Sequence, residues 1–398
     1  MLPTVGPMSS VNERLVALEI IRQVLLLRFS LHVRGLVVKA VNDTEQPVAA
    51  LIRDSLRTDA GLRDPAQVRK LDALIARLNS LRQPAWEAGR VAAEEQLKQL
   101  SEAEPEDQRD MFGFLLPGVS LVLPTLIGLA AGAGSTPFQG RLLRQWFDDA
   151  QNDDAKRIKQ AIYTSAALGE SPASVARAVV GSAAARGADG ATQVSRNHID
   201  TIVRSATVHF SAYARDQFYR ANAAARYAPL PPGTPGAPIG VVPQFGAGDA
   251  AMAEAAAQAA RARAAAGLPP ANAVGVRLFL YEQFVAVLDG RTTKLCRGLD
   301  GKRYRLGIGP IPPLHLNCRS MRILVLPETV GGPQYDPGKY GDWIRRQPFE
   351  VKAMLLGSTK INRLSDDDLA EAAFKDYGAK PMSLKEVREE ARRLMASY

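Results

Sequence analysis

The sequence predicts an α+β protein that is predominantly α-helical, with a small β module near residues 276–326. Apolar residues recur at helical spacings of three and four in the N-terminal region, whereas a run rich in β-branched and aromatic residues appears only after position 276. Aromatic residues make up 6% of the chain and alanine is abundant, which favours packed helices over a large β-sandwich. Contents of 46% apolar and 23% charged residues exclude wholesale disorder and a multi-span membrane protein.

The region 1–110 is predicted to be helical because two apolar stripes in it have a helical period. The stripes are Leu15, Leu18, Ile21, Leu25 and Phe29, followed by Val68, Leu71, Leu74, Ile75 and Leu78. We expect breaks at Pro84, since proline lacks the amide hydrogen of a helix interior, and at the acidic stretch 102–110.

Residues 111–140 form an uncharged segment that we predict to be an extended apolar connector. Its length would allow it to span a bilayer. Pro117, Pro124 and several glycines interrupt it, however, so an unbroken membrane helix is not expected. Burial against other subunits or against the protein's own core is the favoured interpretation.

A helical core region is predicted over 141–228. Ser171 and Pro172 are typical of a helix start, Gly181 of its end, and a long helix is expected from about residue 193 to 224. His198 and His209 in that helix lack a ligand partner three or four residues on, so both are interpreted as surface or core histidines. Residues 229–275 are rich in proline, glycine and alanine and are predicted to be a linker or insertion, with a short helix between 250 and 266.

The basic β module is predicted over 276–328. A strand is expected before Asp289, Asp300-Gly301 is typical of a two-residue hairpin turn, and a further strand is expected from Met321 to Leu326. The C-terminal region 329–398 reads as helical, with a capping box at Ser383 opening a final helix.

Both cysteines of the chain, Cys296 and Cys318, lie within one short stretch together with His315. Two cysteines cannot form a disulfide framework in a chain of 398 residues, which indicates a reducing folding compartment. The N-terminus shows no basic and apolar signal pattern, so no secretion signal is expected.

Three interpretations of this cluster remain open. A zinc site would use Cys296, His315 and Cys318 with Asp289 or water as the fourth ligand, although the spacing matches no common zinc finger. A thiol nucleophile would need a third, orienting residue, and none is apparent. A structural tie would bring the three side chains within a few ångströms and hold the loop 305–314. We favour this tie, metal-free or weakly metallated.

Basic residues are concentrated in the same module. Window 291–325 has eight basic residues and one acidic residue, a net charge of 8 − 1 = +7, against +9 for the whole chain. Such a surface fits a nucleic-acid backbone or an acidic protein partner, although no groove-reading motif accompanies it. The candidate contact residues are Arg291, Lys294, Arg297, Lys302, Arg303, Arg305, Arg319 and Arg322.

Residues 289–319 carry a series of short motifs in a fixed order. They are Asp289-Gly-Arg291-Thr292, then Cys296, then Asp300-Gly301-Lys302-x-Tyr304, and finally Pro312-Pro313-x-His315-x-Asn317-Cys318-Arg319. This series resembles the signature of phage minor head proteins of the Mu-F-like head-morphogenesis family. The chain departs from it at Leu316, where the family has proline, and at Thr293, where many members have the first cysteine of a Cys-x-x-Cys pair. The second departure argues against a site with four protein ligands.

The resemblance covers roughly residues 137–360, with the proline-rich segment as an insertion. It implies a low-copy structural protein of a tailed-phage head, assembled in the host cytoplasm and located in the virion near the portal vertex. Implied partners are the portal protein, other head proteins (major capsid, scaffold or internal proteins) and packaged double-stranded DNA, which such proteins contact or accompany at ejection. We expect no membrane partner in the mature particle and no catalytic activity. The alternative is a metal- or thiol-dependent nuclease or protease that uses Cys296, His315 and Cys318.

Overall fold

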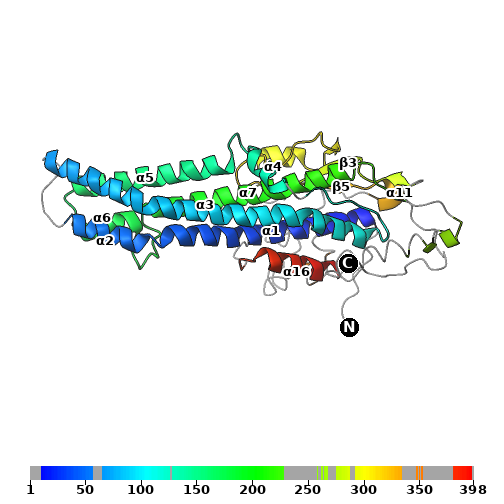
Figure 1. The fold of residues 1–398 in the computed structure, drawn as a ribbon, viewed down its shortest axis with the longest axis horizontal. Helices are drawn as coiled ribbons and strands as arrows, with labels where there is room; N and C mark the ends of the chain where they lie inside the picture. The colour runs from blue at the N-terminus through cyan, green and yellow to red at the C-terminus, as the bar shows by residue number, and fades with distance from the viewer. Residues whose placement is uncertain are drawn as a thin grey trace. The chain divides into compact units, whose positions relative to one another are not determined.

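The computed structural model describes residues 10–56, 65–125, 128–227, 275–286, 292–333 and 380–396, and the isolated positions 258, 261–262, 264–267, 347, 349 and 351–352. It is mostly helical, with a small antiparallel sheet, which confirms the predicted fold class (Figure 1). The larger helices are α1 (Val11–Asn42), α2 (Glu45–Ser55), α3 (Pro65–Leu115), α5 (Leu143–Ala167) and α7 (Thr192–Ala221). The shorter ones are α4 (Leu129–Ser135), α6 (Pro172–Val180), α10 (Lys294–Leu299), α11 (Glu328–Gly331) and α16 (Leu384–Met395).

Capping residues place two helices where the sequence predicts them. Ser171 caps α6 by accepting a hydrogen bond from the backbone of Ser174, and Gly181 ends the helix with a φ of 82°. Ser383 and Glu386 form the predicted capping box of α16, in which each side chain accepts from the other residue's backbone amide. In the predicted helix at 250–266, the described positions 258, 261–262 and 264–265 are helical.

The breaks expected at Pro84 and at the acidic stretch 102–110 are not found, because helix α3 continues through both. Proline removes one hydrogen bond from the ladder and leaves the others in place. The helix is buried on both sides of this proline: Leu78 is fully buried and Trp86 is 2% exposed. Burial of this face therefore outweighs the local preference to end the helix.

The uncharged segment 111–140 is not one helix. Helix α3 ends at Leu115, α4 begins at Leu129, and the described residues between them, 116–125 and 128, are not helical. This confirms the predicted interruption. Among the described residues, no helix combines the length and apolar character that crossing a membrane requires.

The sheet has three antiparallel strands in the order β4-β3-β5. Strand β3 (Tyr281–Val285) is central, between β4 (Arg303–Arg305) and β5 (Met321–Val325), with Glu282 opposite both Tyr304 and Leu324. Strands β1 (Arg226–Tyr227) and β2 (Val276–Arg277) form a separate antiparallel pair. Strand β5 confirms the strand predicted from Met321.

The predicted hairpin at Asp300-Gly301 is wrong, since this turn joins helix α10 to strand β4. The Thr293 side chain accepts a hydrogen bond from the backbone amide of Cys296 at 3.3 Å and so caps a helix that the sequence interpretation had not included. Gly301 has a φ of 76°, and Asp300 Oδ1 accepts from the amide of Ala286 at 2.7 Å. The two residues thus close a turn against the end of β3.

The chain packs into two units. The first comprises Met1–Phe29, Lys98–Ala133 and Thr207–Tyr398, and its core includes an aromatic cluster of Phe112, Phe218, Tyr219 and Phe279 with ring centroids 5.4 to 6.4 Å apart. The second comprises Ser30–Leu97 and Gly134–Ala206. Its apolar core includes Val48, Ile52, Leu74, Leu78, Ile158, Ile162, Val175 and Val179. Each unit combines several segments of the chain, so this division does not test the boundaries that the sequence analysis predicts between consecutive regions.

Candidate metal centre

The β module positions Cys296, His315 and Cys318 from two separate elements. Cys296 lies in helix α10, and its amide is held by the capping Thr293. His315 and Cys318 lie in the loop that leads into β5, where the amide of Cys318 donates to the carbonyl of His315 at 3.2 Å. Asn317 between them has a φ of 57°, a conformation that asparagine tolerates better than most residues. The loop therefore turns both side chains back toward α10.

The three side chains converge as predicted. The Sγ atom of Cys296 lies 3.2 Å from Nε2 of His315 and 3.8 Å from Sγ of Cys318, and the three candidate ligand atoms all lie within 4.8 Å of one another. Both cysteines are free thiols and are 1% exposed. They belong to a small buried cluster with Phe284 and Ala286, so the site is part of the module's core.

This group can hold a metal ion, and the distances between its ligand atoms are close to those of a zinc site. A tetrahedral site with Zn–S bonds of about 2.3 Å and Zn–N bonds of about 2.0 Å places two sulfurs about 3.8 Å apart, and a sulfur and a nitrogen about 3.5 Å apart. The separations of Cys296 from Cys318 and from His315, 3.8 and 3.2 Å, lie close to both values. Thiolate and imidazole are the ligand types that zinc prefers.

The tautomer of His315 fits the same role. Its Nδ1 lies 2.9 Å from the carbonyl oxygen of Leu316, which can only accept, so Nδ1 carries the hydrogen. Nε2 is then the unprotonated nitrogen and faces the Cys296 sulfur. A ligating histidine commonly donates its other ring hydrogen to a backbone carbonyl in this way.

The two thiols also perturb each other's ionisation. The hydrogen bond from Cys318 lowers the pKa of Cys296 to about 5 against the opposing effect of burial, with help from Ser320 and Thr293. The pKa of Cys318 is raised, first by that same hydrogen bond and then by burial. The pair therefore holds one proton between two sulfurs, and a metal ion that displaces this proton would meet two thiolates.

Scans of family models, curated proteins and solved structures found no match to this chain. The candidate site therefore stands on its geometry and on the motif that carries it.

The fourth ligand position is not assigned by the described residues. Asp289, which the sequence analysis names as the fourth ligand, lies outside them, as does the basic residue Arg291. Within the described part of the chain, the group of side chains close enough to share a metal ion consists of Cys296, His315 and Cys318.

The other candidate basic residues divide by burial. Five are exposed and have no ion pair with another described residue: Lys294, Arg297, Lys302, Arg303 and Arg305. Arg319 is half-buried. Arg322 corrects the prediction of a surface contact, because its side chain is 5% exposed and its guanidinium group is paired with Asp216 and Glu282. Its charge is neutralised inside the protein and is not available to a nucleic acid.

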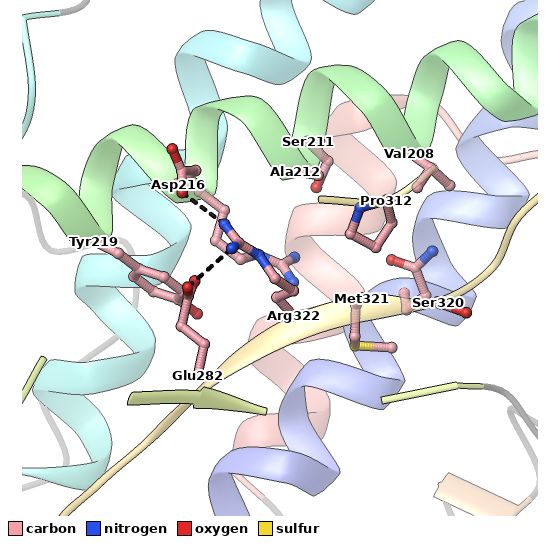
Figure 2. A pocket seen from close by; sticks show the side chains of 12 residues that line it. Val208, Ser211, Ala212, Asp216, Tyr219, Glu282, Pro312, Ser320, Met321 and Arg322 are labelled. Carbon is pink, nitrogen blue, oxygen red and sulfur yellow. Dashed lines mark hydrogen bonds and ion pairs between the residues drawn. The ribbon is translucent and has the colours of Figure 1, made fainter. Parts of the chain in front are cut away.

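Arg322 belongs to a buried charge network that the sequence analysis did not identify. It joins β5 to Asp216 of α7 at 2.6 Å and to Glu282 of β3 at 3.0 Å (Figure 2). A second part of the network joins Arg22 of α1 to Glu104 of α3 at 2.6 Å, and Arg215 of α7 to the same carboxylate at 2.9 Å, with Glu19 beside it.

One signal for this network was present in the sequence. Leu15, Leu18, Leu25 and Phe29 have spacings that place position 22 on the same helix face, and that position holds an arginine. A charge inside an apolar stripe indicates a buried partner.

Proposed function

We propose that the chain is a minor structural protein of a tailed-phage head that acts in head assembly at or near the portal vertex. The motif that spans Cys296, His315 and Cys318 carries the proposal, because it resembles the signature of phage minor head proteins. The convergence of these three side chains in one small core supports it, since the motif then has a structural reason to exist. On this proposal the partners are the portal protein and other head proteins, and the location is the interior of the virion head.

We propose a structural role for the candidate metal centre, with zinc as the ion. The ion would link helix α10 to the loop before β5. Thiolates neutralise the charge of the ion, which reduces its ability to polarise a substrate. The site would therefore stabilise the module and carry out no turnover.

A second candidate function, metal-dependent hydrolysis, has one observation in its favour. Three protein ligands leave a fourth tetrahedral position for water, the arrangement of catalytic zinc sites. Against it, both sulfurs are 1% exposed and pack with Phe284 and Ala286, so a substrate has little access to the ion. The same burial argues against Cys296 as a nucleophile, although its pKa is lowered.

We propose that the basic surface of the module contacts packaged double-stranded DNA. Lys294, Arg297, Lys302, Arg303 and Arg305 are exposed and unpaired among the described residues, which leaves their charges available to phosphates. No base-reading element accompanies them, so the contact would be independent of sequence.

The test is the composition of purified particles. Heads assembled with the full chain should contain it at low, fixed stoichiometry relative to portal, and heads lacking it should form fewer mature particles. Incubation with nucleic-acid and peptide substrates, with and without zinc, should show no turnover. A chain that is absent from particles and hydrolyses a substrate when zinc is added would replace this proposal with the second candidate.

A further inference from the structure

The two thiols of the β module are placed to react with each other as well as with a metal ion. The Sγ atoms of Cys296 and Cys318 lie 3.8 Å apart, and a disulfide bond is about 2.05 Å long, so the sulfurs need to approach by about 1.8 Å. Both thiols are free. Cys318 lies in the loop before β5, outside the described helices and strands, so a small movement of this loop covers the distance.

The surroundings of the pair restrict what it can react with. The chain contains two cysteines, so each has one possible partner within the chain. Both are 1% exposed and pack with Phe284 and Ala286, which keeps them from the cysteines of a second molecule. His315 contacts the Cys296 sulfur at 3.2 Å and is itself half-buried, so the pair lies one side chain below the surface. A small neutral oxidant fits this position better than a bulky one.

We propose that Cys296 and Cys318 form a reversible redox site in which hydrogen peroxide converts the two thiols into a disulfide. One sulfur attacks the peroxide, the O–O bond breaks, and a sulfenic acid and one water form. The other sulfur then attacks the first, the S–O bond breaks, and a second water leaves as the S–S bond forms. The sulfurs lose two electrons to the peroxide oxygens, and both thiol protons end in the waters. A dithiol reductant reverses the reaction by thiol–disulfide exchange.

The disulfide and the proposed ion exclude each other. Zinc binds thiolates, and the oxidation uses both sulfurs, which leaves His315 as the one remaining ligand of the described group. Helix α10 stays linked to the loop before β5 in either state, by the ion or by the covalent bond. The proposal needs only the two thiols, so it is independent of the phage-head function and of metal binding.

The test uses the full chain, freed of metal by a chelator and then treated with hydrogen peroxide. The chain is denatured, its remaining thiols are alkylated, and trypsin cuts it after lysine and arginine. We expect peptide Leu295–Arg297 to be joined to peptide Leu306–Arg319 by a disulfide that dithiothreitol breaks. Unlinked peptides, with thiols intact or oxidised to sulfinic acid, would overturn the proposal, and so would a disulfide between two chains.

Two variants separate the redox site from the metal centre. His315→Ala keeps both sulfurs and should give the same linked peptides as the native chain. Cys318→Ser removes the second sulfur, so oxidation of Cys296 should stop at a sulfenic acid, which dimedone traps. Loss of the linked peptides in His315→Ala would overturn the claim that the two thiols are sufficient.

Zinc loading tests the exclusion of the ion by the disulfide. A zinc-loaded chain should release one ion for each disulfide formed, which a chromogenic chelator detects. An ion that stays bound after the peptides are linked would overturn the exclusion. A chain that binds no zinc and still forms the disulfide would support the redox site and remove zinc from the proposed function, so the two failures are distinguishable.

Discussion

Arg322 and Asp216 form a buried ion pair with a distance of 2.6 Å between nitrogen and oxygen, and this pair joins strand β5 to helix α7. Both side chains are 5% exposed. The same guanidinium group also pairs with Glu282 on the neighbouring strand at 3.0 Å. One arginine therefore ties two strands of the β module to the helical part of the first unit. Its removal would leave the buried Glu282 without its ion-pair partner, whereas Asp216 would keep its pair with Arg220.

Substitution of Arg322 by methionine should be strongly destabilising. Breaking a buried pair by removing one partner costs about 3 to 5 kcal/mol, because the remaining charge stays desolvated. Urea unfolding of the full chain measures the change. Arg303→Met, at an exposed position of β4, is the control and should change the free energy of unfolding by less than about 0.5 kcal/mol. Equal effects of the two substitutions would show that the Arg322 network contributes little.

Loss of a metal ligand should abolish metal binding and loosen the module. We expect Co²⁺, used as a probe for zinc, to give the thiolate charge-transfer and tetrahedral absorption bands with the native chain. Cys318→Ser and His315→Ala should weaken or abolish these bands, and a chelator should lower the Tm of the native chain alone. Leu316→Ala, an exposed neighbour in the same loop, should retain them. A native chain without these bands would favour a metal-free tie.

The convergence of the metal site could be predicted from the sequence for a specific reason. Cys296, His315 and Cys318 are close along the chain, and the loop between the cysteines contains glycines and prolines that cannot form regular hydrogen bonds of their own. The capped helices α6 and α16 were predictable for a similar reason, since a cap is a local interaction.

The buried charge network could not be predicted in the same way. Arg322 and Asp216 are more than a hundred residues apart, and their pairing depends on how β5 packs against α7. In the sequence, Arg322 is one of eight basic residues in a single segment. Its burial depends on the packing of strand β5 against helix α7, which the sequence pattern does not reveal. The Asp300-Gly301 turn shows the opposite case, in which a cap at Thr293 overrode a familiar hairpin pattern.

Acid should weaken the native state through Glu104. Burial alone would raise the pKa of this carboxyl, but Arg22 and Arg215 outweigh it and lower the pKa from 4.5 to about 2. A carboxyl with a lowered pKa contributes stability that is fully present above its unfolded pKa and is lost as the pH falls toward the folded value. The contribution, on the order of 3 kcal/mol, should therefore disappear between about pH 4.5 and pH 2.

Urea unfolding of the native chain and of Glu104→Gln across this pH range measures the effect. The variant should be less stable at neutral pH and should lose less stability as the pH falls to 2. Glu94→Gln, at a half-exposed position of the same helix, should follow the native curve. Parallel native and Glu104→Gln curves would exclude Glu104 as the source of acid sensitivity.

Binding to double-stranded DNA should depend on salt through the exposed cations of the module. Each phosphate contact contributes about −0.9 to the slope of log K against log salt, so the five cations Lys294, Arg297, Lys302, Arg303 and Arg305 give a slope no steeper than about −4.5. Replacing Arg303 and Arg305 by glutamine should make the slope shallower by about 2 and weaken binding equally for unrelated sequences. Replacing Arg144, a 74% exposed cation on α5, should leave the slope unchanged. Binding that is unaffected by the double substitution would remove the β module from the DNA contact and leave an acidic protein as the partner that its charge fits.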